Sequence, residues 1–86
     1  MDIREVVSGS FDIHAQVAFD LPRIMVLGDS SIFVENYLAL CEYKKNSIKL
    51  DTKLGLLEVS GDAFEIREMR QNNIAISGKF YGLKIV

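Results

Sequence analysis

The sequence contains almost none of the residues from which catalytic and metal-binding centres are usually built. It has a single histidine, His14, a single cysteine, Cys41, and no tryptophan. A structural zinc site requires four Cys or His ligands, and a Cys–His nucleophilic pair would have to be built from these two residues alone. The acidic side chains alternate with apolar positions, so we expect their carboxyl groups to point to water. We therefore expect no enzymatic activity and no metal or cofactor.

Long apolar runs and targeting features are absent as well. No run approaches the roughly 18 apolar residues of a membrane-spanning helix. The first residues lack the basic, apolar and small-residue order of a secretory signal. One cysteine cannot form an internal disulfide, which fits a reducing compartment. These absences predict a cytoplasmic protein without direct membrane insertion.

The charge is nearly balanced but unevenly distributed. The net charge is −2, yet residues 1–43 carry two basic and seven acidic side chains, whereas residues 44–86 carry eight basic and five acidic ones. This asymmetry fits either head-to-tail association or two ordinary solvated surfaces. The lysines of residues 44–53 are too sparse for a nucleic-acid site, and the sequence lacks aromatic platforms beside them. We expect protein partners and no nucleic acid.

The only proline, Pro22, separates two kinds of sequence. Before it, apolar residues recur every four positions from Ile3 to Ala15, as in a helix, but residues 11–19 also alternate as in a strand. For residues 1–19 a helix, a strand and an arm that orders on a partner all remain open. Proline disfavours helix at the residue before it. We therefore predict an N-terminal segment over residues 1–19 and a β-domain over residues 20–86.

After Pro22 the apolar residues alternate with polar ones, as in half-buried strands. Turn signals separate the segments, including Gly61-Asp62 and Gly78-Lys79. The connections are too short for parallel βαβ units. We predict an all-β fold, a compact antiparallel meander of about 7–8 short strands closed as a small sandwich or roll. The alternating segments are residues 24–26, 32–34, 38–42, 48–52, 57–59, 64–66, 74–76 and 83–85.

Two of these segments share one pattern, seventeen residues apart. Leu57-Glu-Val-Ser-Gly61 and Ile74-Ala-Ile-Ser-Gly78 both place two apolar residues before a Ser-Gly pair. A solenoid needs about three or more repeats. We interpret the two copies as similar corners in two hairpins.

Several predicted strands, among them Ile24 to Leu27, are apolar on both faces, which is more than one sheet in water requires. The second apolar face must be covered by another layer, by the N-terminal segment or by another chain. The last segment, Phe80 to Val86, has no proline or charged cap and is a candidate edge for a partner strand. The predicted partner interface consists of Ile24, Met25, Val26, Leu27, Phe33, Phe80 and Tyr81.

A series of motifs runs in a fixed order through about residues 11–86. They are Asp20-Leu-Pro-Arg-Ile24, Gly28, Ile32-Phe-Val-Glu-Asn36, Thr52, Leu54-Gly-Leu-Leu-Glu-Val-Ser-Gly61, Phe64-Glu-Ile66 and Ile74-Ala-Ile-Ser-Gly78. In this order they resemble the YabP/YqfC family of sporulation proteins, and especially its YqfC branch. We expect Glu35-Asn36 to form a corner at the end of a strand, through side-chain hydrogen bonds to nearby backbone, and Arg23 to pair with Asp20. The motif residues that we expect to be structural are Asp20, Leu21, Pro22, Arg23, Gly28, Glu35, Asn36, Gly55, Gly61 and Gly78.

The resemblance implies a non-enzymatic protein made in the mother cell of an endospore-forming bacterium, without catalytic residues. It implies action beside a YqfD-like membrane protein, at the outer forespore membrane or the spore coat. Together with the two-faced strands, this predicts a small β adaptor that binds protein partners and that could form homo-oligomers. A self-assembling structural protein of the coat or engulfing-membrane region is the alternative. A small-molecule or glycan module is disfavoured, because no aromatic-lined polar cleft is visible in the sequence.

Overall fold

The computed structural model describes residues 21–86, and these residues form six strands without a helix. All neighbouring strands are antiparallel, and the order β1-β2-β6-β5-β4-β3 leaves β1 and β3 at the edges of one open sheet. The all-β, antiparallel prediction is confirmed, whereas the predictions for residues 1–19 lie outside the described residues. The strands are β1 (Arg23–Leu27), β2 (Ser31–Glu35), β3 (Ala39–Lys44), β4 (Ser47–Thr52), β5 (Gly55–Met69) and β6 (Asn73–Ile85).

The number, length and order of the strands differ from the prediction. We expected turns at Gly61-Asp62 and Gly78-Lys79, but both pairs lie inside long strands, since β5 has 15 residues and β6 has 13. Four predicted segments thereby merge into two, and the described residues form six strands instead of seven or eight. The sheet is open rather than a closed sandwich, and it is not a simple meander, because β2 pairs with β6.

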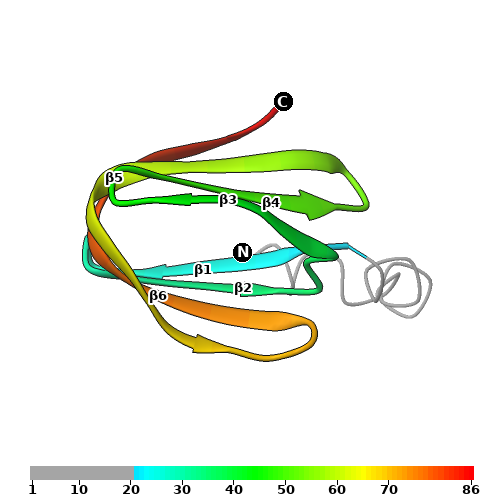
Figure 1. The fold of residues 1–86 in the computed structure, drawn as a ribbon, viewed down its shortest axis with the longest axis horizontal. Coiled ribbons are helices and arrows are strands. Elements are labelled where there is room, and N and C mark those ends of the chain that lie inside the picture. Colours follow the sequence, from blue (N-terminus) through cyan, green and yellow to red (C-terminus); the bar gives the residue numbers. More distant parts are fainter. Residues whose placement is uncertain (1–20) are drawn as a thin grey trace, which may run out of the picture.

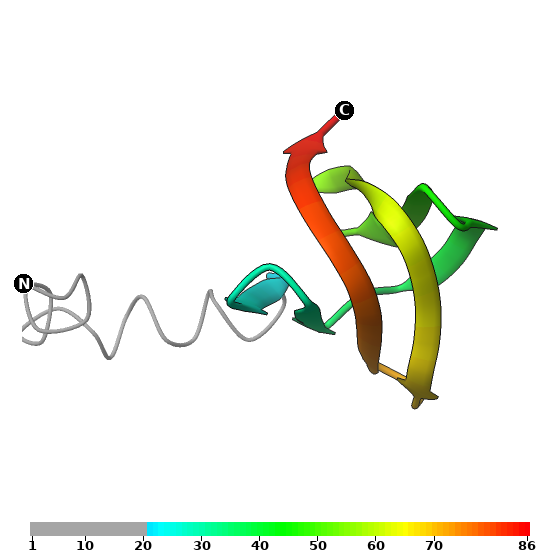
Figure 2. The ribbon, with the colours of Figure 1, turned by 90° about the vertical axis from the view of Figure 1, so that its left-hand side faces the viewer.

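The long hairpin of β5 and β6 bends, so that the sheet folds back on itself and forms two layers. Figure 1 shows β3 and β4 in one layer, β1 and β2 in the other, and the hairpin passing between the layers at one end. Figure 2 shows β5 and β6 curving side by side through this bend. Their ladder shifts register between Ser60 and Gly61 and between Asp62 and Glu65. Such bulges bend a strand and increase its twist, so β5 and β6 change direction at these positions without ending.

The ring of Phe64 occupies the inside of the bend. A Cβ atom at Gly61 would lie 2.2 Å from Phe64 Cζ, and one at Gly78 would lie 2.8 Å from Phe64 Cδ1. Gly78 also has a φ of 138°, which side chains rarely adopt. The two Ser-Gly pairs therefore lie where the backbones of β5 and β6 pass close to the Phe64 ring.

The turns of the two short hairpins hold the bend in place. The N–H of Phe64 donates to the carbonyl oxygen of Lys45 (2.8 Å), in the β3–β4 turn. The N–H of Phe80 donates to the carbonyl oxygen of Asp29 (2.7 Å), in the β1–β2 turn. Lys79 Nζ also lies 3.2 Å from Asp29 Oδ2. Each long strand is thus fixed at its bend by the turn of a neighbouring hairpin.

The core lies between the two layers. Its residues alternate with exposed ones along each strand, which is the period of two that the sequence predicts. The partly buried side chains of Ile24, Val26, Leu40, Ile66 and Phe80 pack around it. The buried apolar residues are Ile32, Val34, Tyr37, Ile48, Leu50, Leu57, Val59, Phe64, Ile74 and Ile76.

Candidate functional site

Asn36 forms the corner that the sequence predicts at the end of β2. Its φ is 65°, in the left-handed region that asparagine tolerates better than most residues. Its side-chain Nδ2 donates to the carbonyl oxygen of Leu21 (3.0 Å), and its backbone N–H donates to the carbonyl oxygen of Asn72 (2.7 Å). One residue therefore joins the entry to β1, the end of β2 and the β5–β6 turn.

The other motif residues also lie at backbone features. Arg23 and Glu35 are directly opposite each other on β1 and β2, with Arg23 Nη1 3.6 Å from Glu35 Oε1. We expected Arg23 to pair with Asp20, but Asp20 lies outside the described residues. Gly28 lies in the β1–β2 turn and Gly55 is the first residue of β5, and both have positive φ. In the described part of the chain these motif residues support the fold.

Removing the Asn36 side chain should weaken this corner. We expect Asn36→Ala to lower the free energy of unfolding by about 1–3 kcal/mol, because alanine loses a hydrogen bond and must adopt a positive φ. Asn36→Gly should lose less stability, because glycine loses the same hydrogen bond but adopts a positive φ without strain. Urea denaturation of both variants measures the difference, and equal stability of the alanine variant and the wild type would refute this role.

The outer face of the layer that contains β3 and β4 carries a row of alternating charges. Glu42, Lys49, Glu58 and Lys84 lie opposite one another across β3, β4, β5 and β6. Lys49 Nζ is 3.8 Å from Glu42 Oε2 and 3.8 Å from Glu58 Oε2, and Lys84 Nζ is 3.5 Å from Glu58 Oε1. Opposite charges on neighbouring strands stabilise the strand pairing, and charged side chains are seldom covered by another layer. This face is therefore suited to water.

The outer face of the other layer is apolar at its centre. Met25, Phe33 and Ala75 lie opposite one another across β1, β2 and β6. Met25 is 40% exposed, Phe33 is 38% exposed, and Leu27, further along β1, is 53% exposed. We call Met25, Leu27, Phe33 and Ala75 the outer apolar patch. The two outer faces of the same small domain thus differ sharply in polarity.

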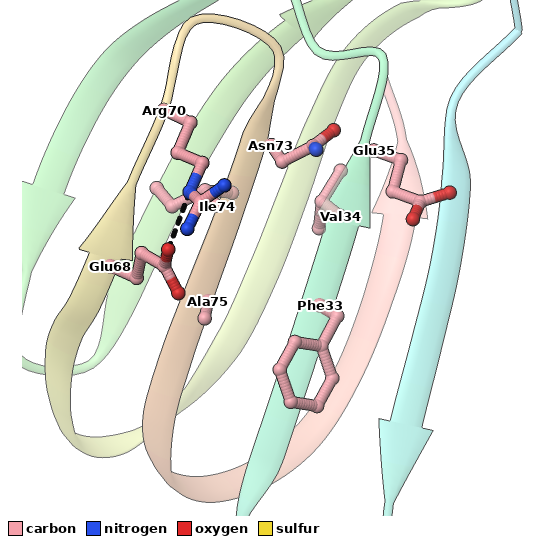
Figure 3. Close-up of a pocket in the computed structure, with 8 residues that line it drawn as sticks. All are labelled: Phe33, Val34, Glu35, Glu68, Arg70, Asn73, Ile74 and Ala75. Carbon is pink, nitrogen blue, oxygen red and sulfur yellow. Dashed lines mark hydrogen bonds and ion pairs between the residues drawn. The ribbon is translucent and has the colours of Figure 1, made fainter.

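A shallow pocket of about 220 Å³ lies beside this patch. Figure 3 shows Phe33 and Ala75 on neighbouring strands, with the Glu68–Arg70 pair beyond Ala75. Pockets for small molecules usually have about 300–1,000 Å³ and a few converging polar groups. This pocket is smaller, and its charged groups already form ion pairs, Glu35 with Arg23 and Glu68 with Arg70. The pocket residues are Phe33, Val34, Glu35, Glu68, Arg70, Asn73, Ile74 and Ala75.

The structure divides the predicted interface residues into three groups. Ile24 and Val26 pack against the core, as does Phe80. The side chains of Met25, Leu27 and Phe33 are exposed on the outer apolar patch. Tyr81 is 65% exposed on the distal half of β6.

The arrangement of β1 corrects one expectation and adds one residue. We expected β1 to be buried on both faces, but it is an edge strand that alternates between exposed and half-buried side chains. Sequence reasoning missed Ala75, because a single alanine carries no signal until the register of β2 and β6 is known.

The polar side chains of residues 21–86 form neither a metal-binding group nor an unsatisfied buried site. Within this range no group of three or more His, Cys, Asp or Glu side chains could hold a metal ion. Every buried side-chain nitrogen or oxygen that the structure describes has a hydrogen-bond partner. In the same part of the chain no helix is long and apolar enough to cross a membrane. The outer apolar patch is a surface feature that needs a functional explanation, because its apolar side chains are contiguous and exposed.

Comparison with known proteins identifies the family. A sequence model of the YabP family matches residues 20–85. Over 69 residues the chain is 32% identical to a protein of Bacillus subtilis (strain 168) named "Uncharacterized protein YqfC", and the match covers 80% of this chain and 74% of that protein. Both matches agree with the family resemblance of the sequence motifs. The chain therefore belongs to the YabP family.

Proposed function

We propose that this protein is a non-enzymatic adaptor of endospore formation that binds a partner protein through the outer apolar patch. The observation that carries the proposal is the contrast between the two outer faces. One carries a charged row, and the other exposes Met25, Leu27 and Phe33 side by side. Contiguous exposed apolar side chains with a polar rim are typical of protein interaction sites.

The geometry suits a partner with an apolar anchor and flanking charges. Phe33 and Met25 can supply the central contact, since aromatic and methionine side chains are enriched in the buried centres of interfaces. Glu35 and the Glu68–Arg70 pair supply a charged rim. Because a domain of this size buries only about 60–65% of its unfolded surface, a partner also adds stability.

Family resemblance suggests the setting for this interaction. The YqfC branch suggests a YqfD-like membrane protein as the partner, in the cytoplasm of the mother cell at the outer forespore membrane or coat. In this proposal the chain stays outside the bilayer and the partner supplies the membrane attachment.

Placing a carboxylate in the patch should abolish the interaction. We expect Phe33→Glu to lower recovery of the partner from sporulating cells by about tenfold or more, because an unpaired charge would be buried in the interface. The matched control is Leu54→Glu, which introduces the same charge at a residue that is 55% exposed in the β4–β5 turn. Quantitative affinity purification of tagged proteins measures the recovery.

Circular dichroism must first show that both variants fold like the wild type. If Phe33→Glu recovers the same proteins as the wild type, or if Leu54→Glu loses them equally, the outer apolar patch is not the binding surface.

A further inference from the structure

The distal half of β6 is an unpaired sheet edge, although β6 as a whole lies in the middle of the sheet. β2 pairs with β6 only from Asn73 to Ser77. From Gly82 to Ile85, β6 pairs with β5 alone. Figure 2 shows this part of β6, in red, with a neighbouring strand on one side only.

The pairing pattern tells which backbone groups face the open side. The N–H of Val86 donates to the carbonyl oxygen of Leu56 (2.8 Å), so the ladder with β5 continues to the end of β6. Backbone groups in an antiparallel strand point alternately to its two neighbours. Gly82 and Lys84 therefore bond to β5, whereas the N–H and C=O groups of Leu83 and Ile85 point to the open side.

The side chains at this edge are apolar and incompletely covered. Leu83 and Ile85 lie opposite Val59 and Leu57, so each pair shares the core-facing side of the sheet. Val59 and Leu57 are fully buried, but Leu83 is 40% exposed and Ile85 is 43% exposed. The apolar layer thus ends at β6 without a strand to close it.

Two of the other edges, β3 and the second half of β5, are interrupted. The register of β3 shifts between Leu40 and Glu42, and the second half of β5 shifts between Ile66 and Glu68 and carries the exposed Glu65–Arg67 pair. Bulges and charged residues of this kind protect edges against pairing. The ladder from Gly82 to Ile85 is regular.

We propose that a second copy of this chain pairs with this edge, antiparallel and with Leu83 opposite Leu83 of the second copy. This register places Tyr81 opposite Ile85 and Gly82 opposite Lys84 of the other copy. The backbone N–H and C=O groups of Leu83 then face those of Leu83 in the second copy, and those of Ile85 face those of Tyr81. Apolar side chains lie opposite apolar or aromatic ones, and no lysine lies opposite another lysine. Centring the pair on Lys84 would place two like charges opposite each other.

The self-complementarity of this segment favours a second copy as the occupant. The contact is two-fold symmetric, and such contacts close after two chains. The dimer joins β6 to β6 and extends one layer of the sheet across both molecules. Because the interface is small, we expect dissociation in the micromolar range, at roughly 10–100 μM. The outer apolar patch stays free, so this inference is independent of the proposed function.

Charge substitution at the symmetry centre tests the proposal. Sedimentation velocity of the full chain, from about 1 to about 500 μM, should show a monomer–dimer equilibrium. Leu83→Lys and Leu83→Glu should each remain monomeric over this range, because each puts identical charges opposite each other. An equimolar mixture of the two variants should recover dimers, since only the mixed pair is complementary. The Phe33→Glu variant should dimerise like the wild type.

Disulfide cross-linking provides a second readout that leaves the edge intact. In a Cys41→Ser background, Leu83→Cys should form a disulfide dimer under mild oxidation, since residues opposite each other in a ladder have Cα atoms within disulfide range. Leu38→Cys, at a residue that is 53% exposed before β3, is the matched control and should cross-link far more slowly. A wild type that stays monomeric would overturn the proposal. The proposal would also be overturned by assemblies that keep growing with concentration, or by dimers that persist in Leu83→Lys. Equal cross-linking of Leu83→Cys and Leu38→Cys would overturn it as well.

Discussion

Replacing Gly61 with alanine is expected to lower the free energy of unfolding by about 3 kcal/mol or more, a large part of the roughly 5–15 kcal/mol of a typical domain. The added Cβ would lie 2.1 Å from the carbonyl oxygen of Lys79 and 2.2 Å from the Phe64 ring. The first of these atoms belongs to the backbone of β6, so the two long strands would have to separate at their bend. Chemical denaturation followed by circular dichroism measures the loss.

Gly82→Ala is the matched control for this prediction. Gly82 lies on the same strand pair, but a Cβ atom there would have no heavy atom within 4 Å. We therefore expect this variant to change the unfolding free energy by less than about 1 kcal/mol. Equal losses in the two variants would show that close packing at the bend is not what requires glycine.

Truncating Phe64 is expected to have a similarly large effect. We expect Phe64→Ala to cost about 3–5 kcal/mol, because the ring is fully buried and its loss leaves a cavity where both layers meet. Phe64→Leu should cost clearly less, since it keeps most of the apolar volume. Calorimetric or urea unfolding measures both, and an alanine variant as stable as the leucine variant would contradict the central role of this ring.

The double variant Gly61→Ala/Phe64→Ala separates the two contacts. Removing the ring relieves one of the two clashes of the Cβ atom added at Gly61, so the double variant should lose less stability than the sum of the single losses. Strict additivity would mean that Gly61 and Phe64 act independently.

The strand interiors could be predicted from the sequence, but the bends could not. The alternation of apolar and polar residues identifies β2 and β4 because each has one buried face. At Gly61 and Gly78 the local sequence fits a tight turn as well as a bend. The choice depends on contacts made only in the folded sheet, namely the pairing of β6 with β2 and the approach of Gly61 to Lys79 and of Gly78 to Phe64.

The candidate site was predictable only in part for a related reason. Alternation indicates that Ile24 and Met25 point to opposite faces of β1, but it does not say which face another layer covers. The predicted interface therefore combined inward and outward residues. Only the register across β1, β2 and β6 brings Met25, Phe33 and Ala75 together.

The most direct test of the proposed adaptor role is a count of heat-resistant spores. Strains of the bacterium that encodes this protein would carry the wild type, Phe33→Glu, Leu54→Glu or a deletion at the native locus, with protein levels matched by immunoblot. We predict that Phe33→Glu lowers spore yield to that of the deletion, whereas Leu54→Glu sporulates like the wild type. Normal spore yield from the Phe33→Glu strain or from the deletion strain would contradict the account.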